Sequence, residues 1–67
     1  MKTDQLRDRG GRILGTITLR DGKYEARTAG GLILGYYDPR NNETRDRGGK
    51  LLGYGNFLAA LIRDTST

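Results

Sequence analysis

The sequence predicts a mostly β protein: a meander of about six short strands followed by one short C-terminal α-helix. Three observations predict this fold. A nine-residue pattern occurs three times, turn-forming residues recur about every 8–12 positions, and one apolar segment near the end has helical spacing. The chain has 67 residues, which is enough for a single domain, 1–67.

The repeated pattern is R-x-x-G-G-x-[IL]-L-G, and its copies begin at Arg7, Arg27 and Arg45. The first and third copies are identical at seven of nine positions. A Gly-Gly pair adopts positive φ without steric cost, so each copy predicts a tight hairpin turn between two strands. The repeat units are expected at about 3–20, 23–38 and 43–55. Nine of the 11 glycines lie in the pattern and are expected to shape turns or strands: Gly10, Gly11, Gly15, Gly30, Gly31, Gly35, Gly48, Gly49 and Gly53.

Two other turns separate the copies. Asp21-Gly22 is a strong signal for a type I′ turn, and Pro39 lies in the second connector. Strands are expected between the turns, at residues 3–8, 12–20, 23–28, 32–38, 43–47 and 50–54. In the second strand, alternation places Ile13 and Ile17 on one face, with Leu14 as an exception.

The fourth strand is apolar on both faces. Alternation places Ile33 and Tyr37 on one side, and Leu32, Leu34 and Tyr36 on the other. An uncovered face of this kind would form an exposed apolar patch. We therefore expect both sides of this strand to be covered, by the C-terminal segment or by a neighbouring subunit.

The last glycine of each copy has no turn to make. Gly15, Gly35 and Gly53 lie within expected strands, where glycine marks a bulge or a close approach of two backbones. Two arrangements remain open: plain bulges, or three strands that crowd one another around a pseudo-threefold axis.

The C-terminal segment predicts a helix over 56–63, with Asn56 as its N-cap and a frayed tail at 64–67. A helix this short has to dock against other apolar groups. The docking site is either in the same chain or in a neighbouring one. The residues expected at an oligomer interface are Phe57, Leu58, Leu61, Ile62 and Tyr36.

The turn-and-strand spacing D-x-x-G-x-[IL]-L-G-x-[IY] is similar to the repeat of small bacterial β-flower proteins. It is carried by Asp8, Gly11, Ile13, Leu14, Gly15 and Ile17, and the likeness covers about 6–55. Arg7 and Arg45 depart from the aromatic residue typical of that family, Thr28 replaces the aspartate, and the terminal helix is extra. The resemblance implies a small petal-like β assembly and carries over no functional residue.

Composition excludes several kinds of site. The chain has no cysteine and no histidine, so disulfides, typical zinc sites, thiol nucleophiles and imidazole bases are absent. The Gly-Gly turns do not match a phosphate-binding loop. We therefore expect no catalytic residues, no cofactor and no metal. No run of 18 apolar residues exists, so we expect no membrane partner and a cytoplasmic location.

The same composition favours self-association. Only 34% of residues are hydrophobic, and short chains without disulfides or structural metals usually gain stability from additional subunits. The leading interpretation is a non-enzymatic homo-oligomeric β-repeat protein that acts as a binding or structural module. The alternative is a basic nucleic-acid-binding module that uses Arg7, Arg9, Arg45, Arg47 and Tyr54. The 8 acidic residues are interleaved with the 12 basic ones, which favours the first interpretation.

Overall fold

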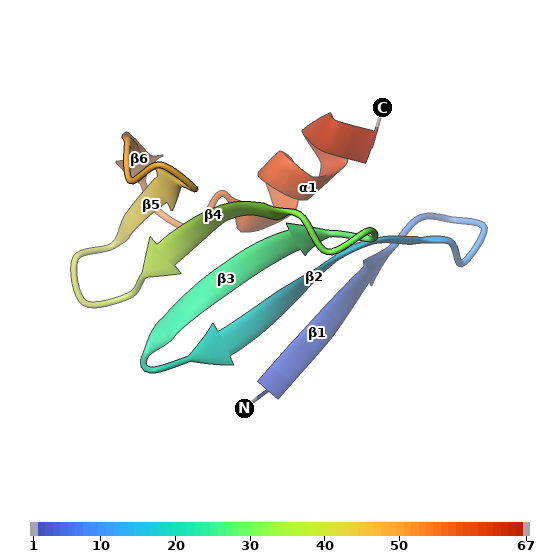
Figure 1. Ribbon diagram of the computed structural model, residues 1–67, viewed down its shortest axis with the longest axis horizontal. Coiled ribbons are helices and arrows are strands. Elements are labelled where there is room, and N and C mark those ends of the chain that lie inside the picture. Colours follow the sequence, from blue (N-terminus) through green and yellow to red (C-terminus); the bar gives the residue numbers. More distant parts are fainter. Residues whose placement is uncertain (1, 67) are drawn as a thin grey trace.

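The fold is a six-stranded antiparallel sheet with one helix, described for residues 2–66 in a computed structural model. The elements are β1 (Lys2–Arg7), β2 (Ile13–Arg20), β3 (Lys23–Thr28), β4 (Ile33–Asp38), β5 (Glu43–Asp46), β6 (Leu51–Tyr54) and α1 (Leu58–Ser66). Each strand pairs with its neighbours in sequence, which confirms the predicted meander. The sheet is open and twisted, and α1 lies over one of its faces (Figure 1).

Positive φ angles locate the turns. Asp21 and Gly22 have φ of 53° and 78°, as the predicted type I′ turn requires. In each Gly-Gly loop only the second glycine has positive φ: 85° at Gly11, 94° at Gly31 and 91° at Gly49. Each of these loops is therefore a tight turn followed by a single left-handed glycine, rather than a turn with two such glycines.

A bulge interrupts the second strand of every Gly-Gly hairpin. Leu6 lies opposite Gly15, whereas Arg7 lies opposite Ile13, so Leu14 is an extra residue without a partner. Equivalent register shifts occur between β3 and β4 and between β5 and β6. A bulge therefore precedes each of the three strand glycines, and the backbones are crowded at Gly15 and Gly35. Because all six strands lie side by side in one open sheet, the pseudo-threefold arrangement is wrong.

In β2 the bulge reverses the predicted faces. Leu14 and Ile17 both pack against the core under α1, whereas Ile13 lies opposite Arg7. The prediction that Ile13 and Ile17 share a face is therefore wrong. Simple alternation fails here because one extra residue moves the following side chains to the other side of the sheet.

The same reversal occurs in β4. Leu34 and Tyr37 pack against the core, and Ile33 lies opposite Arg27. Tyr36 lies opposite Glu25 on the side away from α1. The helix therefore covers one apolar side of this strand, as expected, but the residues on that side differ from those predicted.

The helix begins and ends later than predicted. The side-chain oxygen of Asn56 accepts a hydrogen bond from the Leu58 amide at 3.1 Å, which confirms the N-cap. The helix then runs through 64–66, which were expected to fray. The Thr65 hydroxyl donates to the Leu61 carbonyl at 2.9 Å and satisfies an acceptor in the last turns. Thr67 lies outside the described residues.

The helix packs on its own sheet. Leu58 and Ile62 are 0% and 1% exposed, and they form the buried core with Ala26 of β3. Their neighbours on the sheet lie in β2, β3 and β4, on which α1 sits. The sequence left open whether the helix docks on its own chain or on a neighbouring chain. In the structure it docks on its own chain.

Two strand glycines, Gly15 and Gly35, allow the neighbouring strand and α1 to approach the sheet closely. A Cβ atom at Gly15 would collide with the Arg27 carbonyl oxygen, and it would lie 2.8 Å from Cγ2 of Ile62. A Cβ atom at Gly35 would lie 2.5 Å from the Arg45 carbonyl oxygen. The two glycines therefore create the space that both the neighbouring strand and α1 occupy.

A buried hydroxyl holds the chain reversal between β6 and α1. Thr44 is 0% exposed, and its Oγ1 donates to the Gly55 carbonyl at 2.5 Å. The same oxygen accepts a hydrogen bond from the Phe57 amide at 3.2 Å. Gly55 has φ of 112°, so the chain turns at a residue that needs to be glycine.

We expect Gly15→Ala and Gly35→Ala to lower the free energy of unfolding by well over the ~1 kcal/mol typical of point mutants. Gly53→Ala meets only the Phe57 ring, at 2.9 Å, and this partly exposed side chain can move, so its cost is smaller. Gly10→Ala is the control, because its nearest neighbour would lie at 3.4 Å. Urea unfolding measures all four variants, and equal stability of Gly10→Ala and Gly35→Ala contradicts the prediction.

We expect Thr44→Val to lower the free energy of unfolding by about 1–3 kcal/mol, because it keeps the shape but leaves buried backbone groups unpaired. Thr16→Val is the matched control on β2, where the hydroxyl has no such buried partners. Thermal unfolding followed by circular dichroism compares the two variants. A Thr44→Val protein as stable as Thr16→Val would show that the hydroxyl does not hold the reversal.

Candidate interaction surface on the open face of the sheet

The side of the sheet away from α1 carries no other element of residues 2–66, and we call it the open face (Figure 1). The register of the strands determines which side chains lie on it. They are Thr3, Gln5, Arg7, Ile13, Thr16, Thr18, Arg20, Lys23, Glu25, Arg27, Ile33, Tyr36, Asp38, Glu43, Arg45, Leu51 and Tyr54. The surface combines aromatic, aliphatic and charged groups of both signs.

Three arginines on the open face are held in the same way. The guanidinium groups of Arg7, Arg27 and Arg45 each donate to the carbonyl of the second glycine in their own hairpin loop, at 2.8, 3.0 and 2.8 Å. Each also donates to the side chain two positions earlier in the strand. These acceptors are Gln5 at 2.8 Å, Glu25 at 2.6 Å and Glu43 at 3.2 Å. The arginines are therefore fixed in place, and two of them are paired with carboxylates.

The two ion pairs differ in exposure. The side chains of Arg27 and Glu25 are 36% and 11% exposed, whereas those of Arg45 and Glu43 are 46% and 19% exposed. In both pairs the carboxylate is the more buried partner. Each glutamate thus supports its arginine from within the surface, and the guanidinium stays accessible from solvent.

Aspartates shape the hairpin loops. One carboxylate oxygen of Asp8 accepts hydrogen bonds from two amides of its loop, at 2.9 and 3.0 Å. In the third loop, one carboxylate oxygen of Asp46 also accepts hydrogen bonds from two loop amides, both at 2.9 Å. In the second loop Thr28 stands at the equivalent position, and its hydroxyl accepts one hydrogen bond, from the Leu32 amide. No cluster of three or more acidic or metal-ligating side chains occurs within residues 2–66. These aspartates have the structural role of turn caps.

The predicted interface residues do not form one surface. Leu58 and Ile62 are buried inside their own chain, and Phe57 is 43% exposed beside the Gly53 backbone. Tyr36 lies on the open face, on the other side of the sheet. Leu58 and Ile62 belong to the core of their own chain, and the partly buried Leu61 packs against that core.

The predicted anion-binding residues are also dispersed. Arg7 and Arg45 are held on the open face, whereas Arg9 and Arg47 are exposed in the first and third hairpin loops. Tyr54, on the last strand, is 66% exposed. The structure therefore does not gather these five residues into a single basic patch.

A depression of about 330 Å³ lies on the open face between the second and third hairpin loops. It is lined by Arg27, Gly31, Leu32, Ile33, Tyr36 and Arg47. Sequence reasoning missed it, although one signal was present. Leu32 occupies the loop position where the other two hairpins have Arg12 and Lys50, and it is 53% exposed.

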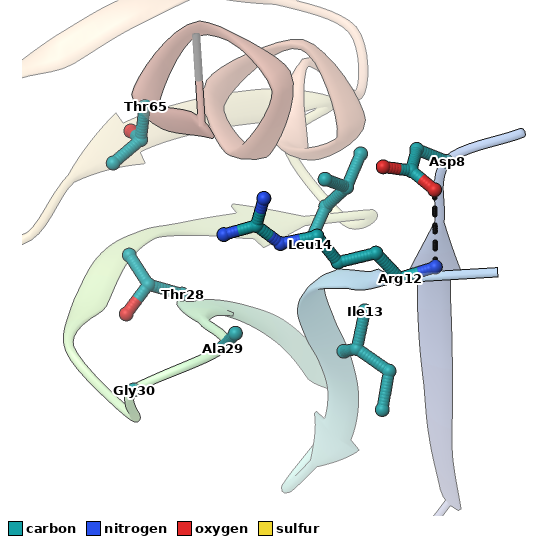
Figure 2. A pocket seen from close by; sticks show the side chains of 8 residues that line it. All are labelled: Asp8, Arg12, Ile13, Leu14, Thr28, Ala29, Gly30 and Thr65. Atoms are coloured by element: carbon teal, nitrogen blue, oxygen red, sulfur yellow. Dashed lines mark hydrogen bonds between the residues drawn. The ribbon is translucent and has the colours of Figure 1, made fainter. Parts of the chain in front are cut away.

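A second depression, of about 390 Å³, lies between the first two hairpin loops and the end of α1. Figure 2 shows Leu14 turned toward the helix and Ile13 turned to the opposite side. The carboxylate of Asp8 in this depression already accepts the Arg12 amide at 3.0 Å. The depression therefore offers one cation and two threonine hydroxyls, without a buried polar group to orient a ligand.

No known protein family, curated protein or solved structure matches this chain. The likeness to β-flower proteins stays a prediction. Within residues 2–66, no helix is long and apolar enough to cross a membrane.

We expect Asp46→Ala to lower the free energy of unfolding by about 1–2 kcal/mol, because two loop amides lose their acceptor. Asp46→Thr is the matched control, because a threonine hydroxyl already caps the second loop. The threonine variant should lose less stability than the alanine variant in urea unfolding. Equal losses would mean that the side-chain cap contributes nothing to the third hairpin.

Proposed function

We propose that this protein is a small non-enzymatic module that associates with copies of itself through the open face. The observation that carries the proposal is that α1 covers one face of the sheet and leaves the other with Tyr36 among aliphatic side chains. An antiparallel sheet with one face in water usually has polar residues on that face. Here Ile13, Ile33 and Leu51 lie there as well, each opposite an arginine. Aromatic residues and arginines are enriched at protein interfaces.

The charge pattern favours a second copy as the partner. Arg27 and Arg45 lie on the open face together with Glu25 and Glu43. In a symmetric dimer the same surface meets itself, so each charge can face one of opposite sign. Such a surface is self-complementary.

The same pairing argues against nucleic acid as the main partner. A formal net charge of +4 and exposed loop arginines favour phosphate binding. A polyanion on the open face, however, would also meet Glu25 and Glu43, which already neutralise Arg27 and Arg45. The open face therefore suits a mixed-charge protein surface better than a phosphate backbone.

Light scattering during size-exclusion chromatography tests the proposal. We expect the wild-type protein to elute as a dimer or larger species at micromolar concentration, and Tyr36→Lys to elute as a monomer, because a charge at the centre of the interface has no partner. Ala60→Lys adds the same charge on the exposed side of α1 and should leave the mass unchanged. A folded wild-type monomer at every concentration would disprove self-association.

Titration of labelled single- and double-stranded DNA and RNA across a salt series tests the alternative. Phosphate contacts make the logarithm of the binding constant fall linearly with the logarithm of salt concentration. Under the proposal, no binding is expected at about 50 mM salt. Tight, salt-dependent binding by a monomer would replace self-association with nucleic-acid binding.

A further inference from the structure

The depression on the open face is lined by apolar and by positively charged side chains. Leu32, Ile33 and Tyr36 supply the apolar groups, and Arg27 and Arg47 supply the cations. The Arg27 guanidinium is already paired with Glu25 at 2.6 Å. Arg47 is exposed and has no hydrogen bond or ion pair to any of residues 2–66, so its charge is available to a ligand.

This chemistry selects a particular kind of group. Apolar lining groups favour an aromatic or aliphatic side chain, and an unpaired guanidinium beside them donates hydrogen bonds to a carboxylate. The occupant is therefore expected to present an aromatic ring next to a carboxylate.

The open face of the same chain presents such a pair. Tyr54 and Glu43 lie directly opposite each other in the ladder between β5 and β6. Tyr54 is 66% exposed, more than any other large hydrophobic residue described. Glu43 Oε1 contacts Arg45 at 3.2 Å, which is a longer contact than that between Glu25 and Arg27. The bond to Arg45 uses Oε1 alone, and the second carboxylate oxygen, Oε2, has no hydrogen bond or ion pair within residues 2–66, so it can meet a second cation.

We infer that two copies associate so that Tyr54 of each lies in the depression of the other, and Glu43 of each pairs with Arg47 of the other. This inference rests on the proposed self-association and specifies its contacts. Tyr36, which also lines the depression, lies opposite Arg45, and Arg45 is two residues from Glu43. A twofold axis close to Tyr36 and Arg45 makes both contacts at once, because a symmetric interface repeats each contact.

Charge reversal tests the inference. Arg47→Glu places a second carboxylate against Glu43, and Glu43→Lys places an ammonium group against Arg47, so each variant alone should dimerise at least about tenfold more weakly than wild type. An equimolar mixture of the two variants should recover association to within about threefold of wild type. In the mixed dimer, one contact joins the two substituted side chains, which have opposite charges. The other contact joins the native Glu43 and Arg47. Sedimentation velocity measures the dissociation constants.

Matched variants separate this contact from general charge effects. Arg9→Glu makes the same substitution at the equivalent position of the first hairpin and should dimerise like wild type. Tyr54→Ser removes the exposed ring without changing charge and should weaken the dimer. Circular dichroism establishes that each variant is folded before its association is measured.

Three outcomes overturn the contact. They are a wild-type dissociation constant for Arg47→Glu, a mixture of folded variants that does not recover association, and equal weakening by Arg9→Glu and Arg47→Glu. Loss of the dimer in Tyr36→Lys together with a wild-type dimer in Arg47→Glu overturns this contact alone and leaves open-face association standing. A wild-type protein that is always monomeric overturns both.

Discussion

The close approach of α1 to the sheet is the contact on which the rest of this small structure depends. Its core has only three fully buried apolar residues among those described, and two of them, Leu58 and Ile62, come from the helix. Ile62 reaches the sheet because Gly15 has no side chain there, and Leu61 of the same helix lies over Gly35 in the same way. A chain with 34% hydrophobic residues has few other groups with which to build a core. The glycines therefore contribute to stability through the space that they leave, rather than through contacts of their own.

Covering one face of the sheet determines the character of the other. With α1 over β2, β3 and β4, the opposite side is left with arginines that are held by loop carbonyls and by the side chains two residues earlier. These bonds fix long, flexible side chains before any partner arrives. Less conformational entropy is then lost on association, which is the physical advantage of a preorganised interface.

Local signals were enough to predict the strands and turns. Asp21-Gly22, the Gly-Gly pairs and the Asn56 cap each act within a few residues, and each has the predicted role. The faces of β2 and β4 were not predictable from alternation, because Leu14 and Leu34 are bulged and change the side on which later residues lie. Gly15 and Gly35, which follow these two leucines, predicted either a bulge or crowding of neighbouring strands. The sequence alone did not decide between the two. The depression was not predicted because Leu32 and Arg47 lie in different hairpins and are far apart in the sequence. Only the folded sheet brings them together.

The reversal held by Thr44 also has a consequence for how the chain is made. The helix follows β6 in sequence, yet it packs on β2 to β4, which precede it by about 20 to 50 residues. During synthesis, a strand such as β3 therefore leaves the ribosome well before the segment that covers it, since translation proceeds from the N-terminus. In a chain without α1, Ala26 and the apolar neighbours that pack against it lack the helix residues Leu58 and Ile62 that bury them. A sheet that forms before α1 is complete has only its own ladders and loop caps to stabilise it.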